Sequence, residues 1–388
     1  MTTTTTSIKE LVDAHAQRMQ EDLTRYLEVE TPSDDEEALR SGLAWVEGWM
    51  ASRLGEPDSR VEVPAQGYGD HRVLEYAGTA PGLVVVLGHY DTVWPLGTLA
   101  GWPVTVDGDR LTGPGAFDMK GGLVQFVYAV VSAREAGWEL PTLRVILNGD
   151  EEVGSVSSRP TIEKYSEGAD AVLVFEASSG GAVKTARKGV GLFTVEVEGV
   201  EAHAGLDPLA GASAVHELAG LVTRLAGATD LGVGTSVNVG VIEGGTRPNV
   251  KAGHAVARLD VRVDRESEME RIDALMDSLA PESELATVTV SGGWNRPVME
   301  RKPGAVRLFE LARDIAAEQG FELQEISVGG ASDGNFAAAK GLDVLDGLGA
   351  VGNGAHARGE WLSLSGMRQR TALVAQLLRE LGRRAGAK

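Results

Sequence analysis

The chain has 388 residues, and its 36 basic and 56 acidic residues give a formal net charge of -20. This acidic balance argues against nucleic acid or an anionic membrane as the main partner. There is no cysteine, so disulfide bonds and thiolate metal sites are excluded, and any metal must be held by His, Asp and Glu. A chain of this length favours two domains over a single core.

The opening residues, MTTTTTSIKE, lack the basic region and apolar core of a secretory signal. Apolar runs such as LVVVLG are far shorter than the ~18 residues that a membrane span needs. We therefore expect a cytoplasmic enzyme.

The first half of the chain alternates predicted helices with short apolar strands. Helical spacing predicts one helix over residues 7–30 and another after Pro32, with Ser33 or Asp34 as its N-cap. Continuous apolar strands between helices are typical of a sheet covered on both faces. The predicted strands are residues 71–78, 83–89, 143–149 and 170–176, and the predicted helices between them are residues 120–137 and 159–168.

The pattern changes at about Arg187. Residues 190–200, VGLFTVEVEGV, alternate apolar and polar side chains, as a half-exposed antiparallel strand does. The order β-α-β-β-α-β follows, which is that of a small ferredoxin-like α+β domain. We therefore predict that residues 187–295 form a domain inserted into a first domain made of residues 1–186 and 296–388.

Carboxylates and a histidine stand where predicted strands stop. Ligands of open α/β sheets bind beyond the carboxyl ends of the strands, so these side chains are expected to converge at one edge. A second histidine lies in a glycine-rich loop far downstream. In chain order the positions are His89 and Asp91, Asp118 in a glycine-rich turn, Glu151 and Glu152, Glu176, and His356.

Each of these features also has a structural reading. A single histidine after a strand is often structural, and adjacent acids such as Asp150 to Glu152 are usually a solvated turn or a charge cluster at a helix start. Together, however, three carboxylates at one edge would repel one another unless a cation neutralised them. Oxygen ligands plus two histidines, without sulfur, suit zinc, cobalt or manganese.

Five motifs occur in order: GHYDTV, GPGAFDMKGG, GDEEVGS, VFEAS and GNGAHARGE. They resemble the co-catalytic zinc metallopeptidase family of glutamate carboxypeptidase, aminoacylase, acetylornithine deacetylase and succinyl-diaminopimelate desuccinylase. The resemblance covers nearly the whole chain, and residues 341–364 are most similar to the glutamate carboxypeptidase branch. It implies an α/β fold in which a mixed-sheet α/β/α catalytic domain carries an inserted ferredoxin-like lid. It also implies a homodimer formed through this lid.

The resemblance also implies two zinc ions per subunit, with cobalt or manganese as alternatives. His89 and Glu176 would hold one ion, Glu152 and His356 the other, and Asp118 would bridge them. A cis peptide is expected after the bridging aspartate.

Two further acids have implied roles around these ligands. Asp91 would accept the free ring N–H of His89 and so orient that ligand. Glu151 would be the general base that takes a proton from water and returns it to the leaving amine.

Substrate contacts are implied in the inserted domain. His203 would stabilise the oxyanion in a neighbouring subunit's site, although a histidine capping the next helix is the plainer reading. Asn249 and Arg262 match lid positions that contact substrate. After Asn249 and Val250 the family usually has an aliphatic residue and proline, whereas this chain has Lys251 and Ala252.

Three more residues lie in residues 296–388, the second stretch of the first domain, with Arg296 at its start. Arg296 matches the arginine that glutamate carboxypeptidases use for the free carboxylate of the substrate, a group that a guanidinium binds in two bonds. A surface ion pair is the alternative reading of Arg296. Gly329 and Gly330 could offer backbone N–H donors and let a substrate approach closely.

The sequence therefore predicts a metal-dependent hydrolase that cleaves the amide bond of N-acyl amino acids or peptides and releases a C-terminal amino acid, with glutamate the first candidate. The alternative is an aminoacylase or deacetylase of other N-acyl amino acids. A catalytically silent binding protein on the same fold is the third reading. The expected partner is a small-molecule substrate, without nucleic acid or membrane.

Overall fold

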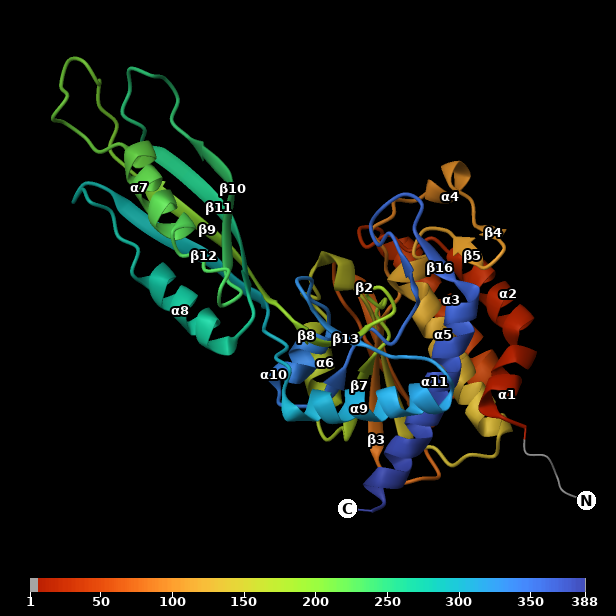
Figure 1. Cartoon of the computed structure of the whole chain (residues 1–388). Coiled ribbons are helices and arrows are strands. Elements are labelled where there is room, and N and C mark those ends of the chain that lie inside the picture. Colours follow the sequence, from red (N-terminus) through yellow and green to blue (C-terminus); the bar gives the residue numbers. More distant parts are fainter. Residues whose placement is uncertain (1–5, 388) are drawn as a thin grey trace, which may run out of the picture. The chain divides into compact units, whose positions relative to one another are not determined.

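A computed structural model describes residues 6–387, so the prediction about the chain's first residues falls largely outside the described range. The chain divides into two compact units (Figure 1). The first unit comprises Met1–Ala186, Arg301–Ser327 and Ser332–Lys388, and the second Arg187–Glu300 and Val328–Ala331. No helix in the described range combines the length and apolarity that crossing a membrane requires.

The first unit is built on a six-stranded mixed sheet in the order β1-β2-β6-β3-β7-β14, which confirms the predicted mixed α/β class. Its strands are β1 (Ser59–Val63), β2 (Gly69–Tyr76), β3 (Leu83–His89), β6 (Thr142–Gly149), β7 (Ala171–Val174) and β14 (Val344–Leu345). The last four run parallel to one another, whereas β1 and β2 pair antiparallel with their neighbours. The carboxyl ends of β3, β6 and β7 therefore lie at one edge.

Helices cover both faces of this sheet (Figure 1). One face carries α3 (Glu36–Leu54), α5 (Gly121–Glu135), α9 (Pro303–Glu318) and α11 (Leu364–Ala385), with α1 (Ile8–Ala14) and α2 (Ala16–Leu27) against α5; the other carries α6 (Arg159–Ser166) and α10 (Gly334–Ala339). Side chains from Leu123 to Val130 of α5 are all buried. A helix that is buried on all sides belongs to a core, so α5 is a rigid support for the turn that precedes it.

Two details of the predicted helices are wrong. The expected helix over residues 7–30 is broken at His15, whose ring nitrogen bonds Glu135 of α5 at 2.8 Å. The N-cap of α3 is Asp35, which accepts the N–H groups of Glu37 and Ala38. Ser33 does not cap the helix because its hydroxyl donates to Asp91 at 2.8 Å.

A small four-stranded sheet of short strands, in the order β15-β16-β5-β4, was not predicted. Its members are β4 (Thr105–Asp107), β5 (Arg110–Thr112), β15 (Gly352–Asn353) and β16 (Trp361–Ser363), and α4 (Thr98–Gly101) precedes them. The pairing of β5 with β16 brings the glycine-rich turn at 113–120 beside the loop at 354–360. A further pair, β8 (Val183–Arg187) with β13 (Glu325–Val328), completes the strands of this part.

The second unit has the predicted β-α-β-β-α-β order, with an antiparallel sheet β10-β11-β9-β12. Its elements are β9 (Gly189–Glu198), α7 (Ala214–Ala226), β10 (Ser236–Gly244), β11 (His254–Val263), α8 (Glu266–Asp277) and β12 (Thr287–Arg296). Leu218 and Leu225 of α7 and Ile272 of α8 pack on the face of the sheet that carries Val195 and Val197. The unit therefore has a core of its own.

Candidate metal centre and substrate-binding residues

Two histidines and three carboxylates meet at the carboxyl edge of the main sheet. Nε2 of His89 lies 3.3 Å from Oδ1 of Asp118 and 3.3 Å from Oε1 of Glu176. Nε2 of His356 lies 3.4 Å from Oδ2 of Asp118 and 2.9 Å from Oε2 of Glu152. Asp118 thus presents one oxygen to each histidine, and the five side chains form two donor groups that share this carboxylate.

The strand topology explains most of this convergence. His89 is the last residue of β3, Glu152 lies in the turn after β6, and Glu176 follows β7 by two residues. Parallel strands bring their ends to the same edge, so the predicted convergence is confirmed. His356 arrives from a distant loop and takes a left-handed backbone conformation with φ 59°, between Gly354 and Gly359, which are also left-handed.

The donor set fits divalent cations. In each group the nitrogen and oxygen donors all lie within 4.8 Å of one another. His89 is buried, and its Nδ1 faces the backbone oxygen of Asp91 at 3.0 Å, so Nδ1 carries the ring proton. The lone pair on its Nε2 then faces two carboxylate oxygens and, within residues 6–387, has no hydrogen-bond partner. A cation between these atoms would satisfy all of them.

The electrostatics of the cluster agree with this reading. Burial opposes a charge on His89, yet the carboxylates of Asp118, Asp91 and Glu176 around its ring raise its pKa well above the usual value. Asp118 and Glu152 raise the pKa of His356 to about 11. Burial raises the pKa of Glu152 to about 7. Three carboxylates packed around two histidines give the site a negative potential, which attracts cations.

Asp91 connects the two sides of the centre. Its Oδ1 lies 3.3 Å from Nδ1 of His89. The same carboxylate accepts the backbone N–H groups of Glu151 at 3.3 Å and Glu152 at 3.2 Å. The opening GHYDTV motif therefore orients one predicted ligand and also fixes the turn that carries another.

The turn around Asp118 is held from outside the predicted set. The Asp118–Met119 peptide is cis, as expected. Glu360 was missed by the sequence reasoning, although its carboxylate accepts N–H groups from this turn. It is fully buried and lies four residues after His356, inside the motif GNGAHARGE. A glutamate so close to a histidine ligand in a glycine-rich loop was the available signal.

The first unit contains the five predicted metal ligands together with Asp91 and Glu151. The second unit contains all the other predicted site residues. His203 is exposed in a loop, and its Nδ1 accepts the N–H groups of Gly205 and Leu206 at 3.2 and 3.0 Å. The N–H of Ala204 donates to the backbone oxygen of Asn249 at 3.0 Å, so these two predicted positions are neighbours.

Lys251 has a structural role of its own at the position where the chain departs from the family pattern. Its Nζ donates to the backbone oxygens of Pro208 at 3.0 Å and Gly211 at 3.3 Å. Ala252 is buried, and its oxygen accepts the N–H of Ala214 at the start of α7. This pair therefore anchors the loop that follows His203.

The two predicted arginines differ in their surroundings. Arg262, on β11, forms a two-bond pair with Asp260 at 2.7 and 2.8 Å. Arg296, at the end of β12, is only 3% exposed, and its Nη1 donates to Oδ1 of Asn295 at 3.1 Å. Gly329 and Gly330 border open space, since a Cβ built on either meets no atom within 4 Å. The glycines thus leave room beside their backbone.

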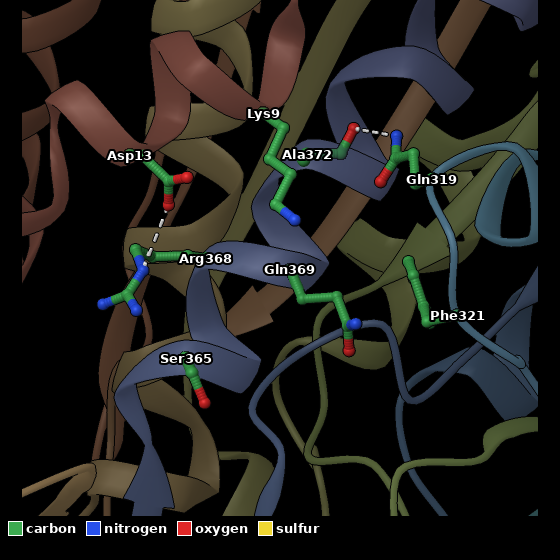
Figure 2. Close-up of a pocket in the computed structure, with 8 residues that line it drawn as sticks. All are labelled: Lys9, Asp13, Gln319, Phe321, Ser365, Arg368, Gln369 and Ala372. Carbon is green, nitrogen blue, oxygen red and sulfur yellow. Dashed lines mark hydrogen bonds and ion pairs between the residues drawn. The ribbon is translucent and has the colours of Figure 1, made fainter.

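A separate hollow of about 290 Å³ lies beside α11 (Figure 2). Arg368 pairs with Asp13 across it at 3.3 Å, and Lys9 and Gln369 also line it. It contains none of the predicted site residues, so it is no part of the candidate centre.

The chain resembles known peptidases. Residues 85–380 match the model of peptidase family M20/M25/M40. Carboxypeptidase G2 of Pseudomonas sp. (strain RS-16) is 30% identical over 373 residues, which cover 93% of this chain and 88% of that protein. Among solved structures, the aminopeptidase PepT of Bacillus cereus ATCC 10987 matches with a TM-score of 0.81 at 20% identity, covering 94% of this chain and 98% of that chain. The YXEP protein of Bacillus subtilis, a dinuclear metal-binding peptidase, matches with a TM-score of 0.69 at 14% identity, covering 96% and 99%. At these identities the solved structures show a common fold alone.

Proposed function

Because the chain belongs to peptidase family M20/M25/M40, we propose that it is a dinuclear carboxypeptidase that releases a C-terminal amino acid from N-acyl amino acids or peptides. Membership itself makes the chain a metal-dependent hydrolase, and it confirms the resemblance that the five motifs indicated. The observation that carries the finer proposal is the division of the two Asp118 oxygens between His89 and His356. The likeness to carboxypeptidase G2 supports the carboxypeptidase reading, with glutamate the first candidate for the released residue.

We assign two zinc ions to the centre, with cobalt and manganese as alternatives. His89 and Glu176 would hold one, Glu152 and His356 the other, and Asp118 both. Such a pair would supply Lewis-acid chemistry, polarising an amide carbonyl and easing the deprotonation of water.

The proton transfers fall to Glu151 in this proposal. Glu151 belongs to neither donor group, although its neighbour Glu152 does. Asp91 holds the backbone N–H groups of both residues and so fixes the turn from which they project. Glu151 would take a proton from the attacking water and deliver it to the leaving amine nitrogen.

Recognition of the substrate is assigned to the second unit. The buried guanidinium of Arg296 suits the free carboxylate of the leaving amino acid, because a guanidinium forks onto a carboxylate in two bonds. Gly329 and Gly330 have the open backbone that a close substrate needs. His203, Asn249 and Arg262 are assigned to the remaining contacts, with His203 acting on the oxyanion in a second copy of the chain.

A homodimer through the second unit is part of the proposal. The edge strand β10 exposes Val241 and Ile242, with exposed fractions of 40% and 59%. An exposed apolar edge is a template for pairing with another strand, which supports association of two copies there. The cytoplasmic location stays a prediction.

The test is amino-acid release from a panel of pteroyl-glutamate, N-acetyl and N-benzoyl amino acids, acetylornithine and a plain dipeptide, with zinc or cobalt and with a chelated control. We expect chelator-sensitive release of glutamate from the acyl-glutamates. Release from other acyl amino acids instead would favour the aminoacylase alternative. No release from any of these compounds by protein with two bound metals would favour the silent binding protein.

A further inference from the structure

Glu360 accepts four hydrogen bonds from two other parts of the chain. Its Oε1 accepts the backbone N–H groups of Phe117 at 2.7 Å and Asp118 at 2.9 Å. Its Oε2 accepts the N–H of Gly115 and the indole N–H of Trp94, both at 3.1 Å. The residue is fully buried, and both oxygens are used.

The backbone of Glu360 is tied to the same turn. Its oxygen accepts the N–H of Gly113 at 3.3 Å, at the start of the turn that carries Asp118. Glu360 also lies between His356, four residues before it, and strand β16, which pairs with β5. It therefore joins the loop of one histidine donor to the turn of the shared carboxylate.

We propose that Glu360 is a positioning residue that fixes the Asp118 turn and the His356 loop to each other and so places both Asp118 oxygens between the two donor groups. The proposal rests on the proposed function, since it concerns how the metal donors are held. In this proposal Glu360 acts on the centre indirectly. It holds the backbone N–H of Asp118, rather than a metal-binding side chain or the substrate.

A carboxylate is required here for a chemical reason. An ionised carboxylate only accepts hydrogen bonds, and all four of its partners are N–H donors. A glutamine would turn an NH₂ group toward either the Phe117 and Asp118 pair or the Gly115 and Trp94 pair. The NH₂ group of the glutamine would then face the two N–H groups of that pair, donor against donor. Those two buried N–H groups would have no acceptor. Glu360→Gln is thus a nearly isosteric change that acts on the turn.

The first measurement is zinc affinity of the metal-depleted protein by calorimetric titration. Residues that orient metal ligands typically contribute 10- to 100-fold to affinity, so we expect Glu360→Gln to weaken zinc binding about 10- to 100-fold. The matched control is Asp22→Asn in α2. Asp22, like Glu360, is a buried carboxylate that accepts an indole N–H, in this case from Trp49 at 2.8 Å. The control should lower Tm without weakening zinc binding. Unchanged affinity in Glu360→Gln, or an equal loss in the control, would overturn the proposal.

Hydrogen exchange in metal-free protein separates this proposal from the proposed function. In Glu360→Gln the amides of residues 115–118 should exchange about tenfold faster than in the wild type, and those of α2 should not. A wild type that bound no zinc would refute the proposed function, whereas unchanged exchange at 115–118 would refute the role of Glu360.

Should Glu360→Gln not fold, Trp94→Phe removes one of the four donors to Glu360. This variant should give a smaller increase in exchange rate, confined to the same turn, and no increase would count against the proposal.

Discussion

Glu152 contacts His356 at 2.9 Å, whereas the adjacent Glu151 is in neither of the two donor groups of the centre. Glu151→Gln keeps the size of the side chain but removes a group that can take up a proton. We expect kcat to fall by about 10²- to 10⁴-fold while two metals stay bound. Glu152→Gln is the matched control and should weaken the binding of one metal. Turnover that survives Glu151→Gln, or metal loss equal to that of the control, would remove Glu151 from the mechanism.

Asp22 predicts an acid dependence of stability. Burial would raise its pKa, but hydrogen bonds from Arg53, Trp49 and Tyr128 hold it below its usual value. Folding therefore favours the ionised form, so the stabilisation is present above the unfolded pKa of about 4 and is lost as pH falls through the lower folded pKa.

The measurement is Tm of the wild type and Asp22→Asn between pH 7 and pH 3. The variant should be less stable by about 2 kcal/mol at pH 7. The difference between the two should shrink as pH falls below about 4. Parallel curves over the whole range would contradict this account of Asp22.

At the scale of elements, the first turn of α5 is packed directly against the segment that carries Glu176. A Cβ added to Gly122 would lie 2.0 Å from the backbone oxygen of Phe175, so either α5 or the end of β7 must move. We expect Gly122→Ala to cost about 1–3 kcal/mol of stability and to weaken metal binding.

A second glycine gives the control for that prediction. Gly48 lies in α3, and a Cβ there meets no atom within 4 Å. Gly48→Ala should stabilise the protein by about 0.5–1 kcal/mol and leave metal affinity unchanged. Thermal unfolding and zinc titration of both variants check the pair. A Gly122→Ala protein as stable as Gly48→Ala would show that α5 and β7 are not packed as tightly as the structure has them.

The elements also show how far the sequence could predict this site. His89, Glu152 and Glu176 were predictable because each follows an apolar strand, and parallel strands end at a common edge. The small sheet that brings His356 to them is made of strands of two or three residues, too short for any periodic pattern. The contacts of Glu360 depend on that sheet, so its position four residues after His356 could mark the residue but could not predict its partners. The sequence could not show that Ser33 is unavailable as the N-cap of α3, because its hydroxyl donates to Asp91, which lies 58 residues away in the chain.

At the scale of the whole molecule, the proposed role of His203 in a second copy predicts complementation between inactive variants. Glu151→Gln keeps His203, and His203→Ala keeps Glu151. A mixed dimer would hold one site with an intact Glu151 and an intact partner His203. Dissociating and reassociating an equal mixture should restore roughly a quarter of wild-type activity. No recovery, in a sample shown to contain mixed dimers, would place His203 in the site of its own subunit or outside catalysis.

The central claim is that His89, Glu176, Asp118, Glu152 and His356 form one two-metal hydrolytic centre. The most direct measurement follows bound zinc and glutamate release from pteroyl-glutamate on the same sample while metal is added back to metal-free protein. We predict that release is absent without metal and reaches its plateau at two bound ions per chain. Full activity without metal, or two bound ions without hydrolysis of any acyl amino acid or peptide, would contradict it.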